Sequence, residues 1–152
     1  MIPNTSARVP LHTSKRANRE IEARTSESVR WHAAHLNRID SRLRELDEEW
    51  DIERVLEANA SALALSGVML AATVDRRFLA LPALVTAFLL QHAIQGWCPP
   101  LPILRRMGFR TMREIDIERY ALKALRGDFG PIGPGGERRD TPASHALQAA
   151  RL

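Results

Sequence analysis

Cysteine chemistry is the first activity to consider, because Cys98 lies in the unusual segment Gly-Trp-Cys-Pro-Pro-Leu-Pro at positions 96–102. Nearby Arg105 and Arg106 would stabilise a thiolate, the form of cysteine that acts as a nucleophile or sulfur carrier. The prolines indicate another role, since they cannot continue a helix and the carboxyl end of a helix opposes thiolate formation. We therefore expect no catalytic residue, Cys98 as a candidate thiol, and a helix-stop motif formed by Gly96, Trp97, Cys98, Pro99, Pro100 and Pro102.

Other groups that bind metals or cofactors are sparse. As the only cysteine of 152 residues, Cys98 can form neither an intramolecular disulfide framework nor a cysteine-based zinc site. His32 and His35 come close to metal-ligand spacing, but no further ligand completes a set. The sequence also has no Gly-rich phosphate loop and no Ser/His/Asp arrangement. These features predict no metal, no cofactor and no enzymatic activity.

Three polar residues, Gln91, His92 and Gln95, precede the helix-stop motif, and Gln91, Gln95 and Cys98 follow helical spacing. Polar groups at membrane depth face protein and not lipid. We expect this intramembrane polar stripe to form hydrogen bonds between helices. A proton or ligand path through His92 is the alternative, although no intramembrane acid accompanies it.

Two uncharged stretches indicate the elements that position these groups. Residues 58–74 are 17 residues without a charge and residues 78–104 are 27. A bilayer core needs about 20 apolar residues in a helix, so the sequence predicts a transmembrane hairpin over 52–104, with helices at about 55–74 and 78–97. Small residues spaced four apart favour close packing of the two helices; they are Ala58, Ala62 and Ser66, Ala60 and Ala64, and Gly67 and Ala71.

A heptad pattern precedes the hairpin and predicts a cytoplasmic, coiled-coil-like helix over 26–51. Charged residues occupy its other faces, so this helix would bury a single stripe against a partner, most simply in a parallel homodimer. Residues 1–25 are expected to be disordered or weakly ordered. The expected seam consists of Val29, His32, Leu36, Ile39, Leu43, Leu46 and Trp50.

Capping residues predict one more helix after the hairpin. Thr111 and Glu114 form a capping box, and Gly127 is suited to end the helix, which gives a short amphipathic helix over 111–126. Its imperfect apolar stripe fits a cytoplasmic or interfacial position. The Gly/Pro-rich tail at 128–152 is expected to be disordered. The predicted fold class is therefore all-α, with a transmembrane hairpin between a long heptad helix and this short helix.

Charge determines the expected location. The chain has 22 basic and 18 acidic residues, and residues 1–15 lack the apolar run of a signal peptide. Arginines gather on both sides of the hairpin, whereas its turn has only Arg76 and Arg77. The positive-inside rule then predicts a bacterial inner-membrane protein with both termini in the cytoplasm. The basic residues would attract anionic lipid headgroups, so we expect the bilayer and no nucleic acid as a partner.

The two apolar helices, together with Gly96-Trp97-Cys98-Pro99 and Gly108-Phe109-Arg110-Thr111, resemble the YgaP-type transmembrane-domain family. The acidic-basic stretch at 51–54 is similar in kind, and the resemblance spans about 51–111. It implies an inner-membrane helical hairpin that is often dimeric and has no established activity of its own. Some relatives carry a rhodanese domain, so the resemblance also implies a partner connected with sulfur transfer.

Three hypotheses of function follow from the sequence. The first is a non-enzymatic, self-associating scaffold or anchor in the inner membrane. The second is an accessory role in thiol or sulfur-transfer chemistry through Cys98. The third is a soluble oligomeric bundle in which the same apolar helices meet in a shared core.

Overall fold

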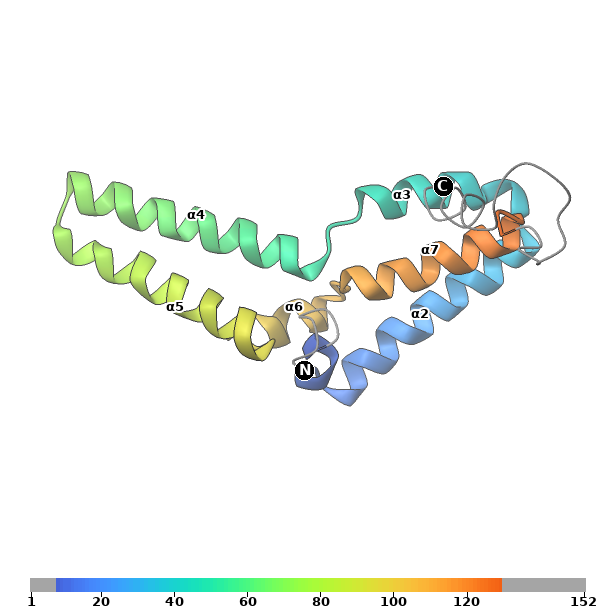
Figure 1. Cartoon of the computed structure of the whole chain (residues 1–152), viewed down its shortest axis with the longest axis horizontal. Coiled ribbons are helices and arrows are strands. Elements are labelled where there is room, and N and C mark those ends of the chain that lie inside the picture. Colours follow the sequence, from blue (N-terminus) through green and yellow to red (C-terminus); the bar gives the residue numbers. More distant parts are fainter. Residues whose placement is uncertain (1–7, 130–152) are drawn as a thin grey trace, which may run out of the picture.

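The computed structural model describes residues 8–129, and within this range every regular element is a helix. The helices form two groups that lie end to end along the long axis of the molecule (Figure 1). Helices α4 (Ile52–Thr73) and α5 (Ala80–Gln95) form a hairpin at one end. Helices α2 (Lys15–Ala34), α3 (Ile39–Glu48) and α7 (Met112–Arg126) form a bundle at the other, and α6 (Leu101–Met107) lies at the junction.

The bundle has a closed apolar core. Helix α7 packs against both α2 and α3, and its capping box forms as predicted, with Thr111 accepting from the Glu114 backbone amide and the Glu114 side chain accepting from that of Thr111. Gly127 ends the helix. Ile115 and Leu122 of α7 thus lie inside the bundle, whereas Met112, Ile117 and Leu125 are exposed. The core consists of Ile39, Leu43, Leu46, Ile115 and Leu122.

The prediction of disorder over 1–25 is wrong for the residues that the structure describes. A 3-10 helix (Val9–His12) is followed by α2, whose first turn is capped by Ser14 through its bond to the backbone amide of Ala17. Val9 and Ile21 are buried. The first half of α2 shows little apolar periodicity because few of its residues are buried, so the pattern predicted a helix only from residue 26 onward. Residues 1–7 lie outside the described residues, as does the predicted tail from residue 130 onward.

The prediction of one continuous heptad helix over 26–51 is also wrong. The chain leaves helical geometry at His35, which has φ −133° and ψ 59°, and again between Glu49 and Asp51. A 3-10 turn (Leu36–Arg38) joins α2 to α3. Of the seven seam residues, Ile39, Leu43, Leu46 and His32 are buried, Val29 is half-buried, and Leu36 and Trp50 are exposed. The three-and-four spacing therefore reflects two helices that face α7 of the same chain.

The two helices of the hairpin occupy the predicted positions, although α4 begins earlier than expected and α5, at 16 residues, is shorter. The Asp51 side chain caps α4, and the Asp75 side chain accepts from the Arg77 amide in the turn before the 3-10 helix Arg76–Leu79. The two helices pack closely at Gly67, where a Cβ atom would lie 2.5 Å from Cδ of Pro82. A small residue at this position lets α4 and α5 meet, as the small-residue pattern predicts.

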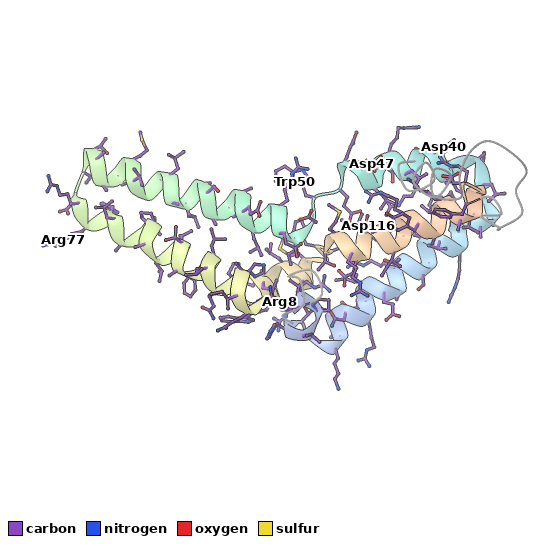
Figure 2. All side chains as sticks on the ribbon, viewed as in Figure 1. Arg8, Asp40, Asp47, Trp50, Arg77 and Asp116 are labelled. Atoms are coloured by element: carbon purple, nitrogen blue, oxygen red, sulfur yellow. The ribbon has the colours of Figure 1, made fainter. Side chains whose placement is uncertain are left out.

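Two helices are long and apolar enough to cross a membrane, one within the stretch Leu36–Thr73 and the other at Arg76–Gln95. Only 17% and 6% of the residues in their most apolar windows are buried. A core helix of a soluble protein would bury most of such a window. Figure 2 shows Arg77 at the tip of the hairpin and Arg8 and Trp50 at its other end, near the bundle.

Within the predicted helix-stop motif, Gly96 ends α5, although the prolines were expected to do so. Gly96 takes the left-handed conformation, with φ 75°, directly after Gln95, so the helix ends before the prolines. Pro100 is the N-cap of α6 and Pro102 lies in its first turn, where a missing backbone N–H costs nothing. The prolines therefore begin the next helix. Helix α6 itself was not predicted.

Candidate functional site at the junction

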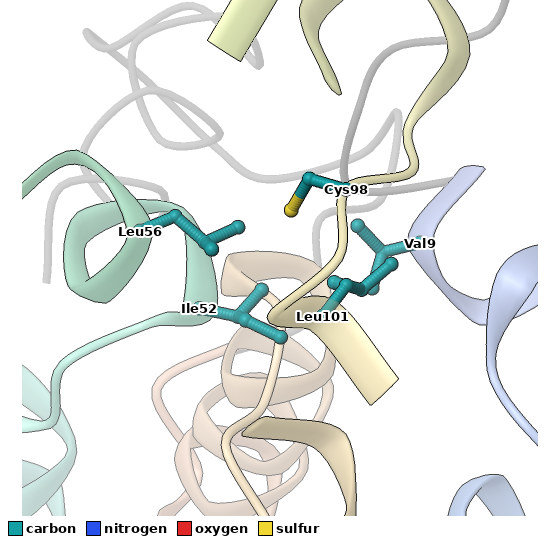
Figure 3. Packing of buried hydrophobic residues seen from close by; sticks show 5 residues of the cluster. All are labelled: Val9, Ile52, Leu56, Cys98 and Leu101. Carbon is teal, nitrogen blue, oxygen red and sulfur yellow. The ribbon is translucent and has the colours of Figure 1, made fainter. Parts of the chain in front are cut away.

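The junction between hairpin and bundle brings together segments that are far apart in the sequence. An apolar cluster joins Val9, the first turns of α4 and the segment after α5 (Figure 3). Trp97, Leu104 and Phe109 pack around it. The backbone amide of Ile52 also donates to the carbonyl of Arg110 (2.8 Å), which fixes the start of α4 to the segment before α7. The cluster consists of Val9, Ile52, Leu56, Cys98 and Leu101.

Cys98 is buried within this cluster and only 4% exposed, with its sulfur directed toward Leu56 (Figure 3). Burial raises the pKa of its thiol above the ordinary value, and a hydrogen bond from the Leu101 backbone only partly opposes this effect. The expected lowering by neighbouring arginines does not occur, because Arg105 turns its guanidinium toward Glu114. Cys98 is therefore a neutral thiol in apolar surroundings.

An apolar cavity of about 390 Å³ lies between α4, α5 and the segment after Gly96. Cys98, Pro100 and Leu104 line it on the side of the junction. The two hairpin helices provide the remaining walls. Neither the cavity nor its link to Cys98 was predicted, because both depend on how far α4 and α5 diverge from their contact at Gly67.

Arg105 is the polar centre of the junction and is almost completely buried, at 1% exposure. Its guanidinium binds the Glu114 carboxylate through two hydrogen bonds, Nη1 to Oε2 (2.6 Å) and Nη2 to Oε1 (2.8 Å). It also donates to Thr13 Oγ1, Asn18 Oδ1 and the Phe109 carbonyl. Burial disfavours ionisation of Glu114, but the bonds from Arg105 and the Thr111 amide outweigh it and lower the pKa of that carboxyl. One side chain thus joins α6 to α2 and α7.

A second ionic network lies inside the bundle around Glu118, which is fully buried. Its carboxylate accepts from Ser28 Oγ (2.6 Å), from Arg42 Nε (2.8 Å) and from Arg110. Arg110 also binds Glu49, with Nε 2.7 Å from Oε1. Burial opposes ionisation of Glu118, yet these donors lower its pKa to about 2. The network fixes α3 and the end of the junction to α7 while keeping every charge paired.

Neither these two networks nor Arg8 was predicted from the sequence. Arg8 donates to the backbone carbonyls of Ala93 (2.9 Å) and Ile94, which are left without partners within α5 because the helix ends there. Contacts between residues that are far apart in the sequence produce no recognisable local sequence pattern. Arg110 and Glu49 are 61 positions apart, and only the capping box at Thr111 pointed to Glu114.

The predicted polar stripe is only partly reproduced. Gln91 and Gln95 are bonded to each other along the same helix (3.4 Å), where hydrogen bonds between helices were expected. His92 is buried at 7% exposure on the face of α5 that carries Val85, Phe88 and Leu89, and neither ring nitrogen has a hydrogen-bond partner among the described residues. The stripe therefore does not join α5 to α4.

Histidines in the bundle have structural contacts. His32 Nδ1 lies 2.7 Å from the carbonyl of Ser28, and the His35 ring stacks on Trp31 with centroids 4.1 Å apart. Over residues 8–129, no three His, Cys, Asp or Glu side chains are grouped closely enough to hold a metal ion.

Comparisons of the chain with protein families, with curated proteins and with solved structures find no match.

Proposed function

We propose that this protein is a non-enzymatic inner-membrane anchor, in which α4 and α5 cross the bilayer and the three-helix bundle lies on the cytoplasmic side. The exposed apolar surface of the hairpin carries the proposal. Its most apolar windows bury 17% and 6% of their residues, whereas the adjoining bundle has a closed core and paired internal charges. A bilayer would cover the first region and water would solvate the second.

Aromatic and cationic residues support a position of the junction at the level of the lipid headgroups. Trp50 lies near the start of α4 (Figure 2), with the Arg54 guanidinium 4.5 Å from its ring centroid. Trp97 follows the end of α5. Tryptophan prefers the headgroup level, and arginine extends its charge toward phosphates there. The greater number of arginines on this side, compared with Arg76 and Arg77 at the tip, supports a cytoplasmic bundle.

Rigid coupling supports the scaffold role. Arg105 joins three elements of the junction, and the Ile52–Arg110 backbone bond holds the start of α4 against the bundle. The bundle would therefore keep a fixed orientation toward the membrane surface. A homodimer and a partner connected with sulfur transfer stay predictions, and the raised pKa of Cys98 gives the thiol hypothesis no support.

Membrane extraction followed by topology mapping tests this proposal. An integral protein stays in the pellet after a carbonate wash, whereas a soluble bundle is released. For topology, we would compare Arg77→Cys at the tip with Asp40→Cys in the bundle, both in a Cys98→Ser background. A membrane-impermeant maleimide added to intact cells with a permeable outer membrane should label position 77 and leave position 40 unlabelled. Release by carbonate, or the reverse labelling pattern, would overturn the proposal.

A further inference from the structure

The cavity at the base of the hairpin is a candidate binding site that the anchor role does not explain. Its volume is about 390 Å³ and no charged residue lines it. A dry apolar cavity of about 150 Å³ accommodates one benzene molecule, so simple scaling gives room for roughly 15 carbon atoms. This size suits a single hydrocarbon chain. The walls include Leu56, Ala60 and Leu63 from α4 and Val85, Phe88 and Leu89 from α5.

The polar groups in the lining need no ligand. The side-chain amide of Asn59 donates to the carbonyl of Val55 (2.8 Å), and Cys98 offers only a weakly polar sulfur. Because an occupant would meet no charge and almost no polar group here, the lining selects for a hydrocarbon and against a headgroup, a nucleotide or a peptide backbone.

The surroundings of the cavity indicate where that hydrocarbon comes from. Its walls are the two membrane-crossing helices, and residues beside the lining, such as Leu65 and Leu90, are 65% and 63% exposed on the same helices. The lining is therefore continuous with the surface that the anchor proposal assigns to lipid. An unfilled cavity would lose van der Waals contacts on all its walls.

We infer that an acyl chain of a bilayer phospholipid occupies this cavity and completes the packing between α4, α5 and the Cys98–Leu104 segment. This inference depends on the membrane location proposed above. The bound chain would extend the apolar cluster at Cys98 and Leu56 into the membrane. The bound chain would then fill the space between the two helices near the junction, whereas the helices pack directly against each other at Gly67.

Native mass spectrometry of the full-length protein, released from nanodiscs of phosphatidylethanolamine and phosphatidylglycerol, tests the inference. The wild-type chain should retain one phospholipid. Ala60→Phe would fill the cavity and should lower the retained fraction at least fivefold. Ala62→Phe adds the same side chain at an exposed position of α4 and should retain lipid like the wild type. Equal retention by both variants, or no lipid on the wild type, would overturn the inference.

A second measurement uses the wild-type chain, so that the inference can still be tested if Ala60→Phe does not fold. Cys98 is the only thiol and lines the cavity. Its rate of reaction with N-ethylmaleimide should rise several-fold after delipidation and fall again when dioleoylphosphatidylglycerol is added. A reaction rate that is the same with and without lipid would overturn the inference. So would slow reaction of Cys98 in a lipid-free dimer. Carbonate extraction distinguishes the two proposals. If the protein stays in the membrane pellet but retains no lipid, the lipid-binding inference is wrong and the anchor proposal still stands.

Discussion

The bundle and the hairpin differ in how much of their side-chain surface is buried within the chain. Inside the bundle, Glu118 and Arg110 are buried with all their charges paired, and an apolar core lies next to them. Past its first two turns α4 buries only Gly67, and α5 buries only His92. The bundle is therefore stabilised by contacts within this chain, whereas most apolar side chains of the hairpin are exposed in the structure. Substitutions in the two regions should have correspondingly different effects.

The largest difference should come from the buried network. Glu118→Gln removes the buried carboxylate that Arg42 and Arg110 share and leaves them only their more exposed partners, Glu45 and Glu49. We expect a loss of about 3–5 kcal/mol in the free energy of unfolding of the bundle. Chemical denaturation of the detergent-solubilised protein measures it. Glu45→Gln is the matched control, because its bond to Arg42 is exposed and should contribute under about 1 kcal/mol. Equal effects would mean that the network is not buried as described.

Apolar truncation compares the two regions directly. Leu122 is fully buried in the bundle, while Leu65 is 65% exposed on the hairpin. Leu122→Ala should destabilise the bundle by about 2–5 kcal/mol through the lost burial and the cavity that remains. Leu65→Ala should leave bundle unfolding unchanged in the same denaturation experiment. A large effect of Leu65→Ala would show that the hairpin surface packs against protein and not lipid.

The contact between α4 and α5 should respond to added volume. In Gly67→Ala the new Cβ would lie 2.5 Å from Pro82, so the helices must move apart, at a cost of about 1–3 kcal/mol. Thermal unfolding followed by circular dichroism should show a less stable hairpin and an unchanged bundle. Ser66→Ala is the control, since Ser66 is exposed and bonds only within its own helix. An unaltered hairpin would contradict the close approach at Gly67.

Acid should affect the bundle and spare the hairpin. The pKa of Glu118 is lowered in the folded protein to about 2, so its stabilising contribution is complete above the ordinary carboxyl pKa and is lost as pH falls toward 2. The lowered pKa of Glu114 acts in the same direction. The Tm of the bundle should therefore fall progressively below about pH 4.5. Glu118→Gln should show a weaker fall, and identical curves would assign the acid sensitivity elsewhere.

The smallest effect should come from the capping box. Thr111→Val keeps the size of the side chain and removes the hydroxyl that accepts from the Glu114 amide, with an expected loss of about 1 kcal/mol. Thr73→Val at the end of α4 removes an exposed hydroxyl that bonds to the Met69 carbonyl and should not change bundle unfolding. The difference between the two denaturation midpoints measures the cap.

Local signals predicted part of this architecture. The uncharged stretches placed the two hairpin helices, and Thr111, Glu114 and Gly127 placed both ends of α7. Predictions from these features were correct because the length of an apolar stretch and the capping of a helix depend only on residues that are close in the sequence. The first half of helix α2, residues 15–25, was missed because it buries few residues and lacks an apolar stripe.

The candidate site was much less accessible to sequence reasoning. Cys98 was recognised as distinctive, yet its surroundings raise the thiol pKa where nearby arginines suggested the opposite. The heptad spacing correctly indicated a buried apolar stripe, but this stripe lies on two helices that pack against α7 of the same chain. The spacing alone does not identify the helix against which a stripe packs.

The sequence by itself determined which segments need an apolar environment and where several helices begin and end, since hydrophobicity and capping act over a few residues. Only the tertiary structure decided that Arg105 pairs with Glu114, that Arg110 joins Glu49 to Glu118, and that α4 and α5 diverge around a cavity. Ion pairs need contact within a few ångströms, and a cavity depends on the separation of whole helices. Both depend on positions in space that neighbouring residues in the sequence do not specify.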